Sequence, residues 1–347
     1  MRLMFVNWAF ENHGSAQDIH NYAQAARAMG HDVALYGPGN GHSGFPYSKD
    51  VEAADAVVFI FEYTTFLEKL DFARLVSRVP RRRRVVIDCD GKYNDWIRLA
   101  GDYNHLDAAA ARRWVEVCDS LSDKICQPAP RPLRPNVRPF LFHAYNPAWE
   151  TAPGSPDKPY GMRYVGNNWF RWRPLERLLR TLEPIRSEVG RIGLVGNGWT
   201  NLPERRDPDV DGEAYYNDPS YLRRLEVEVL PPVRFDRVVE AMSQAVFHPV
   251  LYRPLFDHLG LVTCRTFETP AAGAIPLFAL DPAHVEATYG EEGLELALPD
   301  RRPEEKVLEV LRQPGRYERV VQAIRRRLAE KHSYAARLQE LIEIVEN

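Results

Sequence analysis

The sequence predicts an α/β protein built from two parallel-sheet domains in tandem. Its 347 residues are many for one domain and enough for two. Short apolar runs alternate with helical stretches in both halves, which is the spacing of right-handed βαβ units. A stretch rich in proline and polar residues, 146–160, separates the halves and is interpreted as a linker. We therefore expect domains at 1–145 and 161–325, followed by a C-terminal helix at 326–347 that can pack back on the first domain.

The first half opens with the clearest strand–helix–strand pattern. Ile19, Tyr22, Ala23 and Ala26 fall on one face of a helix, and Gly30 is placed to cap its end. The expected helices are Ala16–Met29, Thr65–Val76 and Asp107–Asp119, and the expected strands are Leu3–Phe10, His31–Tyr36, Asp55–Phe61, Arg84–Asp88, Lys124–Gln127 and Arg138–Phe142.

The second half repeats this rhythm after the linker. The expected strands are Met162–Val165, Arg191–Val195, Val227–Leu230, Ala245–Leu251 and Ala274–Phe278. Helices are expected at Leu175–Leu182, Arg234–Ser243, from Phe267 to Ala272, and over Pro303–Val345 with a break at Pro314 and Gly315; residues 201–220 are expected to form a polar loop. Because open parallel sheets bind ligands beyond the carboxyl ends of their strands, the loops after these strands are where chemistry is expected.

Bulk composition excludes several classes of protein. The net charge of -3 shows no basic surplus, so we expect no nucleic-acid partner. The four cysteines form no Cys-x-x-Cys pair or zinc spacing, and no apolar run is long enough for a membrane span, so a cytoplasmic location is expected. A nicotinamide cofactor and a P-loop are not expected, because both glycine fingerprints are absent.

The most informative segment is Gly260–Pro276, at a loop-to-helix entry. Arg265 and Glu268 are three residues apart, on one face of a first helical turn, with Thr266 and Phe267 between them. A helix start and an arginine together suit a diphosphate, and a carboxylate suits ribose hydroxyls. The alternative is an Arg–Glu pair that only closes the helix end.

This segment resembles the signature of group 1 glycosyltransferases with the GT-B fold. The Arg-Thr-Phe-Glu-x-x-Ala-x-Gly form resembles the CgeB-like branch, and His332-Ser333-Tyr334-x-x-Arg337-Leu338 is similar to the closing helix of that branch. Gly30-His31-Asp32-Val33 is similar to the opening βαβ unit of the family.

The resemblance implies two Rossmann-like domains that face each other across a cleft, with a nucleotide-sugar (NDP-sugar) donor bound by the second. Glu268 would bind the ribose, and Arg265 the diphosphate. Many members of the family carry another glutamate eight residues earlier, where this chain has Gly260. That departure leaves the donor sugar and the stereochemistry open.

Two further loops of the second half are expected at the donor. Arg171 and Arg173 follow the first strand there and can stabilise a diphosphate leaving group, unless they only form a packing corner. Gly196, Asn197 and Gly198 follow the next strand, and Trp199 beside them can stack on a base, although a simple turn is the alternative.

A catalytic base is sought on the first half, facing the donor. His13 lies in the loop after the first strand, as a histidine often does in inverting members of the fold, and Asp90 follows a later apolar strand. Gly14, next to His13, is placed with the donor-binding residues. For each of these a plain surface or turn residue is the alternative.

No metal and no cofactor are expected beyond the NDP-sugar co-substrate. Asp88 with Asp90, and Asp207 with Asp209 and Asp211, alternate as metal ligands can, but the first pair lies away from the donor motif and the second set lacks a closing glutamate. The predicted function is metal-independent transfer of a hexosyl or related group to a small-molecule, glycan or protein acceptor. A nucleotide-sugar 2-epimerase and a non-catalytic nucleotide-sugar-binding scaffold are the alternatives.

Overall fold

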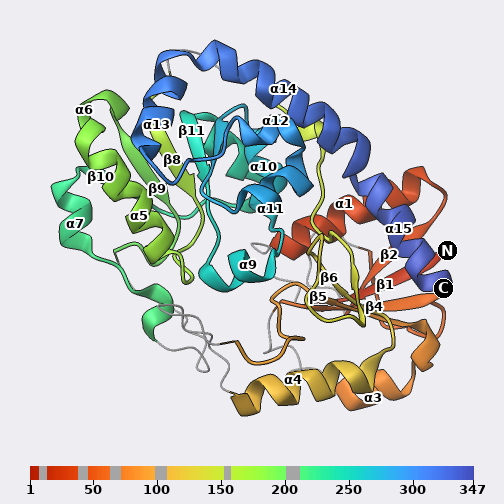
Figure 1. Cartoon of the computed structure of the whole chain (residues 1–347). Helices are drawn as coiled ribbons and strands as arrows, with labels where there is room; N and C mark the ends of the chain where they lie inside the picture. Colours follow the sequence, from red (N-terminus) through yellow and green to blue (C-terminus); the bar gives the residue numbers. More distant parts are fainter. Residues whose placement is uncertain (8–13, 38–45, 63–71, 98–107, 152–157, 201–211) are drawn as a thin grey trace.

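Two parallel β-sheets, each covered by helices, organise the chain in the computed structural model (Figure 1). The structure describes residues 1–7, 14–37, 46–62, 72–97, 108–151, 158–200 and 212–347. Among them, no helix is long and apolar enough to cross a membrane.

The first sheet has seven strands in the order β3-β2-β1-β4-β5-β6-β7, all parallel. These strands are β1 (Arg2–Val6), β2 (Asp32–Tyr36), β3 (Tyr47–Ser48), β4 (Ala56–Phe61), β5 (Arg84–Asp88), β6 (Ile125–Gln127) and β7 (Val137–Pro139). Alternate residues along the strands pack into separate cores on the two faces. One core contains α1 (Gly14–Ala28) and α15 (Tyr334–Glu346), and the other contains α3 (Phe72–Ser77) and α4 (Ala108–Leu121).

The second sheet has five parallel strands in the order β10-β9-β8-β11-β12. They are β8 (Tyr160–Val165), β9 (Ile192–Val195), β10 (Val227–Leu230), β11 (Ala245–Val250) and β12 (Ile275–Phe278). The helices of this half are α5 (Trp172–Leu182), α6 (Arg186–Val189), α7 (Pro219–Arg224), α8 (Val238–Ser243), α9 (Pro254–Leu259), α10 (Cys264–Ala271), α11 (Pro282–Tyr289), α12 (Glu291–Leu294), α13 (Pro303–Arg312) and α14 (Pro314–Lys331).

The structure confirms the α/β class with parallel sheets and corrects several local expectations. Helix α10 begins at Cys264 rather than at Phe267, and Arg265 lies in its first turn, as its spacing from Glu268 predicted. Helix α14 runs without a break through residue 326, where a boundary was expected, and ends at Lys331. The short helices α7, α9, α11 and α12 were not predicted, because too few residues carry a helical period. Three of them begin with a proline, which is favourable at the first helical position.

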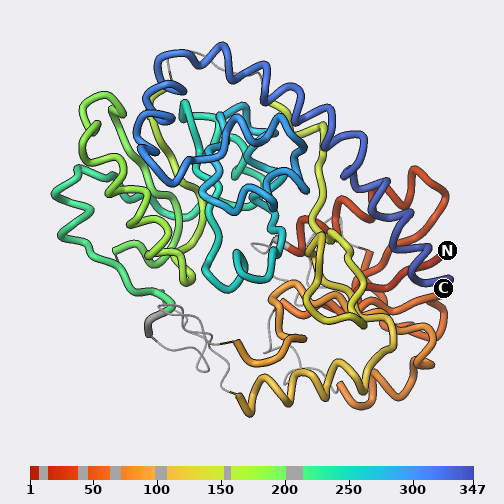
Figure 2. The backbone as a smooth tube through the Cα atoms, in the orientation of Figure 1, coloured from red at the N-terminus to blue at the C-terminus, as the bar shows by residue number. Residues whose placement is uncertain are grey.

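The end of the chain returns to the first half. Helix α15 packs along α1, and the two run side by side in Figures 1 and 2. Tyr145, which follows the first sheet, forms a bridge with Ser333 at the start of α15. Arg325 of α14 donates hydrogen bonds to the carbonyls of Pro270, Ala271 and Thr151. These buried contacts fix the C-terminal helices to both halves of the molecule.

Candidate donor and acceptor site

Loops beyond the strand ends of the two sheets contact each other. Asp90, after β5, forms ion pairs with Lys92 at 3.5 Å and with Arg253, just before α9, at 3.3 Å. The backbone N–H of Val262 donates to the carbonyl of Pro128, after β6, at 2.6 Å. Gly91 packs so closely on α9 that a Cβ there would lie 2.5 Å from a methyl carbon of Leu259. The carboxyl ends of the two sheets therefore meet around Asp90.

Arg265 and Glu268 form an ion pair in the first turn of α10. The Nε group of Arg265 also donates to the carbonyl of Val165, the last residue of β8, at 2.7 Å. The Glu268 side chain is only 2% exposed, whereas that of Arg265 is 22% exposed. Burial lowers the pKa of Arg265, but the Glu268 carboxylate outweighs that effect and raises it. Arg265 therefore stays charged and holds the Glu268 side chain in place at the edge of the second sheet.

Thr266 and Phe267, both expected at the donor, are fully buried. The Thr266 hydroxyl pairs with that of Tyr252 at 2.5 Å and accepts the Thr263 N–H at 3.3 Å. The Thr266 carbonyl accepts the hydroxyl of Tyr289 at 3.0 Å. These residues therefore anchor the start of α10 in the core rather than face a ligand.

A buried histidine on β11 supports the same edge. The Nε2 atom of His248 accepts the backbone N–H of Val165 at 3.1 Å, and its Nδ1 atom lies 3.4 Å from the hydroxyl of Thr269 on α10. Its pKa is lowered to about 3, mainly by burial and to a smaller extent by the positive charge of Arg265. His248 is therefore a neutral structural group with both ring nitrogens paired.

The loops after β8 and β9 are bound to each other. The Asn167 side chain accepts the N–H of Asn197 at 2.8 Å, and a Cβ on Gly196 would lie 2.3 Å from the Gly166 carbonyl oxygen. Trp199 is fully buried, and its indole N–H donates to that carbonyl at 2.9 Å. The expectation that Trp199 stacks on a base is therefore wrong, because the close contact of the loops needs its ring inside. Asn197 remains exposed, whereas Gly198 is buried.

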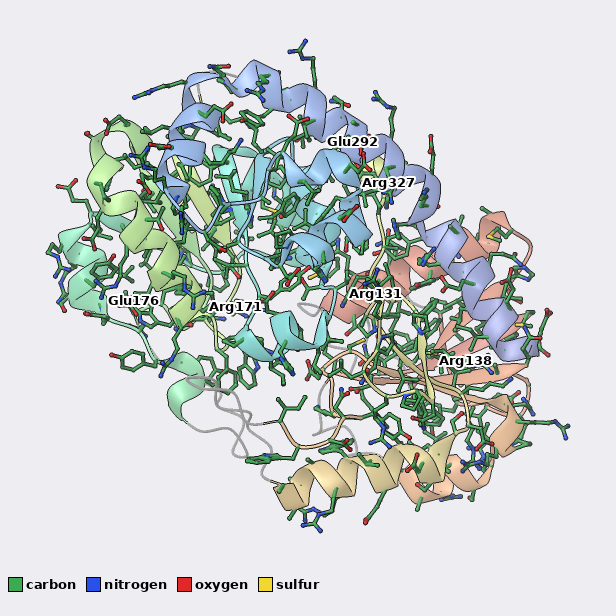
Figure 3. All side chains as sticks on the ribbon, viewed as in Figure 1. Arg131, Arg138, Arg171, Glu176, Glu292 and Arg327 are labelled. Atoms are coloured by element: carbon green, nitrogen blue, oxygen red, sulfur yellow. The ribbon has the colours of Figure 1, made fainter. Side chains whose placement is uncertain are left out.

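Arg171 and Arg173 lie at the start of α5. Arg171, labelled in Figure 3, is half-buried and donates to the carbonyls of Asn167 at 3.4 Å and Trp169 at 3.3 Å. Arg173 is exposed. Arg171 therefore shapes the loop after β8, while Arg173 leaves its guanidinium available at the same edge.

On the first half, the predicted catalytic residues have different outcomes. His13 lies outside the described residues, and Gly14 is the first residue of α1. Asp90 is 19% exposed and neutralised by the nearly buried Lys92 and Arg253, so it joins the two halves. A role for Asp90 as a base stays a prediction.

Asp88, considered as a metal ligand with Asp90, is fully buried. It accepts the backbone N–H groups of Lys92 and Tyr93 and the amide of Gln127, at 2.7 to 3.0 Å. Within the described ranges, no group of three or more His, Cys, Asp or Glu is placed to hold a metal ion. Asp207, Asp209 and Asp211 lie outside those ranges.

Three buried polar side chains of the first sheet's helices and loops form a hydrogen-bonded row that the sequence did not reveal. His143, after β7, pairs through Nδ1 with Asp18 of α1 at 2.7 Å, and the hydroxyl of Tyr334 in α15 donates to the other Asp18 oxygen at 2.5 Å. Burial lowers the pKa of His143, but Asp18 outweighs it, and Glu62 and Glu268 add to the rise. The one signal in the sequence was a carboxylate on the apolar face of a helix, since Asp18 is four residues before Tyr22.

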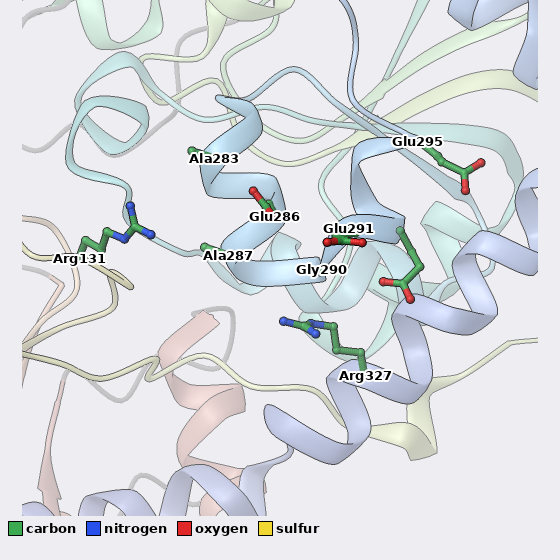
Figure 4. Close-up of a pocket in the computed structure, with 9 residues that line it drawn as sticks. Arg131, Ala283, Glu286, Ala287, Gly290, Glu291, Glu295 and Arg327 are labelled. Carbon is green, nitrogen blue, oxygen red and sulfur yellow. The ribbon is translucent and has the colours of Figure 1, made fainter.

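A hollow of about 940 Å³ is lined by none of Asp18, His143, Tyr334 and Arg265. It is bordered by α11, α12, α14 and Arg131 (Figure 4). Its ionic side chains are Arg131, Glu286, Glu291, Glu292, Glu295 and Arg327. Four carboxylates against two guanidinium groups repel a diphosphate, so this hollow does not fit the donor.

Comparison with solved structures shows which proteins share this fold. Over the full length of this chain, the fold matches that of GT-B glycosyltransferases. An α-glucosyltransferase in complex with UDP-glucose and DNA containing an abasic site matches with a TM-score of 0.69 at 14% identity, over 100% of this chain and 99% of that chain. A β-glucosyltransferase of T4 phage in complex with UDP-glucose matches with a TM-score of 0.59 at 13% identity, over 100% of both chains.

The sequence of the second half gives the more particular likeness. Residues 173–343, just under half of the chain, match the family described as "Glycosyl transferase-like". The matched stretch contains Arg265 and Glu268, and the likeness agrees with the glycosyltransferase class that the sequence predicted. No protein of curated function matches the chain in sequence.

Proposed function

We propose that this chain transfers a sugar from a nucleotide-sugar donor to an acceptor hydroxyl, without a metal ion. One observation carries the proposal. Inside the glycosyltransferase domain, the Glu268 carboxylate and the Arg265 guanidinium lie together at a helix start, at the carboxyl edge of a parallel sheet. Loops of the other sheet meet this edge and provide a place for the acceptor. The fold is shared with enzymes whose structures hold UDP or UDP-glucose.

Each part of the donor has a matching group at this edge. Glu268 can accept hydrogen bonds from ribose hydroxyls while Arg265 holds its other oxygen in place. Arg265 uses Nε and Nη1 within the protein, which leaves Nη2 for a phosphate. Arg173 is exposed nearby and can stabilise the departing diphosphate. Cationic side chains and the α10 dipole would thus supply the charge that a metal supplies elsewhere.

The acceptor belongs to the proposal as well. We expect it to be a small molecule, a glycan or a protein, because the net charge of -3 gives no basic surplus for a phosphate backbone. The α-glucosyltransferase of similar fold was determined with DNA, so duplex DNA belongs in the acceptor panel. A cytoplasmic location is part of the same proposal.

The first experiment is a thermal-shift panel with UDP, GDP, TDP, CDP and ADP, each with Mg²⁺ and with EDTA. A nucleotide that binds only the folded chain raises its melting temperature. We expect a rise with one nucleotide that EDTA does not remove. No rise with any nucleotide at millimolar concentration contradicts a nucleotide-sugar donor, and a rise that EDTA abolishes contradicts the metal-free mechanism.

Two variants test where the nucleotide binds. Glu268→Ala should weaken NDP binding about 10- to 100-fold, since hydrogen bonds to a charged group contribute about 1.5–3 kcal/mol. Glu286→Ala removes an exposed carboxylate at the acidic hollow and should leave the affinity unchanged. The opposite pattern would place the donor elsewhere. Release of sugar from the NDP-sugar then separates an enzyme from a non-catalytic scaffold.

A further inference from the structure

The linker between the two halves holds the C-terminal end of helix α10. Thr151 donates its backbone N–H to the carbonyl of Ala271 at 3.0 Å and its hydroxyl to that of Ala272 at 2.6 Å. Lys158 donates its Nζ group to the carbonyl of Gly273 at 2.9 Å. The last carbonyls of a helix find no donor within the helix itself, and here the linker provides the donors.

Arg325 of α14 completes this contact from the other side. Its Nε group donates to the carbonyl of Pro270 at 2.8 Å, and Nη2 donates to those of Ala271 and Thr151 at 2.9 and 3.0 Å. Its Nη1 group lies 3.6 Å from the Glu150 carboxylate. Arg325 is only 3% exposed, so water cannot replace these partners. Every nitrogen of the guanidinium group therefore contacts α10 or the linker.

Helix α10 depends on external contacts for its position. Pro270 lies in its last turn and has no N–H group, so the carbonyl of Thr266 lacks its usual donor and accepts the Tyr289 hydroxyl instead, at 3.0 Å. Gly273 follows with φ at +65°. A helix of only eight residues is not stable by itself in water. The groups that hold its two ends therefore determine where it lies.

The other end of the same helix carries the pair proposed to bind the donor. Arg265 lies in the first turn, and the carbonyl of Glu268 accepts the N–H of Ala272 at 3.0 Å, so Glu268 is one turn away from the end that the linker holds. At about 1.5 Å per residue, the whole helix is about 12 Å long. A shift at its C-terminal end therefore moves the carboxylate and the guanidinium at the donor edge.

We infer that Arg325 is a positioning residue for the donor, and that it couples α10 to the linker between the halves. This inference rests on the proposed function. The linker also contacts the start of α15, because the N–H of Tyr145 donates to the His332 carbonyl at 2.8 Å and the hydroxyl of Tyr145 donates to Glu150. An ordered linker then favours nucleotide binding. Because coupling between two sites is reciprocal, a bound nucleotide must order the linker by the same factor.

Arg325→Met tests the positioning role, because it removes the charge and every hydrogen bond of the side chain. The probe is the nucleoside diphosphate that raises the melting temperature most in the thermal-shift panel. Titration calorimetry on the folded variant should show a Kd about 5- to 30-fold higher than that of the wild type. Arg325→Lys keeps the charge and should recover part of the affinity. Arg326→Met, which removes the neighbouring exposed arginine of α14, should bind as the wild type does. Equal affinities of the wild type and Arg325→Met overturn the inference.

Thr151→Val provides a milder test if Arg325→Met does not fold. It removes the hydroxyl bond to Ala272 and keeps the shape of the side chain, and it should weaken nucleotide binding about two- to fivefold. Thr181→Val is the matched control, because the Thr181 hydroxyl also donates to a backbone carbonyl, that of Arg177 in α5 at 3.2 Å. Equal affinities of the two threonine variants overturn the inference.

Hydrogen exchange measured by mass spectrometry separates positioning from a general loss of stability. Saturating nucleotide should slow exchange in the wild-type peptide 145–151, although no residue of that peptide belongs to the proposed donor site. Arg325→Met should lose this protection, and helix α3 should exchange alike with and without nucleotide. A wild type that binds nucleotide without protecting the linker overturns the coupling alone. A wild type that binds no nucleotide overturns the proposed donor as well, so the two failures differ.

Discussion

The two halves of the molecule each bury a histidine near the meeting strand ends, and the two rings behave in opposite ways. His143 lies against Asp18, which raises its pKa although burial lowers it. His248 is fully buried, and Arg265 adds to the lowering, so that its pKa falls to about 3. The sign of the neighbouring charge, rather than the depth of burial, separates them. The first half thus holds its histidine among carboxylates, and the second beside the cation expected to bind a phosphate.

The largest effect expected from this difference is the loss of stability in acid caused by His248. The unfolded chain binds a proton at this residue near pH 6.5, whereas the folded chain does not until about pH 3. The unfolded state therefore binds more protons in this window. The free energy of unfolding decreases as the pH is lowered, by up to about 1.4 kcal/mol per pH unit. Urea denaturation between pH 4 and 6.5 should show a shallower slope for His248→Gln.

Two half-buried histidines, His284 and His332, also contribute to this pH dependence. Burial lowers the pKa of His284 and of His332 to about 4 in each case. Each of them therefore also lowers the free energy of unfolding as the pH falls below 6.5. The His248→Gln variant should therefore retain part of the acid dependence. An unchanged slope in that variant would show that His248 is protonated in the folded chain, and the contrast with His143 would fail.

The next largest effect concerns the loops after β8 and β9, where we propose that the donor binds. Gly196→Ala places a Cβ 2.3 Å from the Gly166 carbonyl oxygen, at a φ of +144°. Because backbone must move to relieve this contact, we expect a loss of about 2–3 kcal/mol in the free energy of unfolding. Gly190→Ala is the matched control, with φ at +69° and nothing within 4 Å of its Cβ. Its loss should be smaller, about 1–2 kcal/mol, from backbone strain alone.

Equal losses in the two glycine variants would mean that the loops after β8 and β9 separate readily. The NDP affinity of Gly196→Ala gives a second measure, because the same loops carry Asn197 and lead into Arg173 on α5. We expect that affinity to fall in Gly196→Ala and to stay unchanged in Gly190→Ala.

Asp18→Asn breaks the comparison directly by removing the charge beside His143. The amide still offers one acceptor, so the cost should be about 1–2 kcal/mol of unfolding free energy. Without its counter-charge, His143 should resemble His248, with a pKa below the ordinary value. NMR titration of the ring protons measures this. A pKa that stays raised would assign the effect to Glu62 and Glu268 instead.

The sign of the stability change follows from the direction of the His143 shift. In the wild type its pKa is raised, so its stabilising contribution is full below the unfolded pKa and is lost as the pH rises through the folded pKa. Asp18→Asn should remove that contribution. Its cost should therefore be larger at pH 6 than at pH 9, which is the reverse of the trend for His248→Gln.

The sequence predicted the contact between Arg265 and Glu268 but not the contact between Asp18 and His143, for a physical reason. Arg265 and Glu268 meet because they are one helical turn apart, so their spacing alone predicts the contact. Asp18 meets His143 from 125 residues away and Tyr334 from 316 residues away, and only the packing of α1 and α15 on the first sheet joins them. The strands were predictable from buried apolar runs, whereas the burial of Trp199 depends on two loops packing together.

The smallest effect expected is also the sharpest test of whether Arg173 helps to bind the NDP phosphates. Arg173 is exposed at the start of α5, so Arg173→Ala should leave folding nearly unchanged. It should weaken NDP binding about three- to fivefold, the range of an exposed ion pair, and the difference should shrink at high salt. Arg223→Ala removes an exposed arginine from α7 and is the control. Titration calorimetry measures the NDP affinity of both variants. Equal affinities would show that Arg173 does not bind the phosphates and would leave Arg265 on α10 as the proposed phosphate-binding cation.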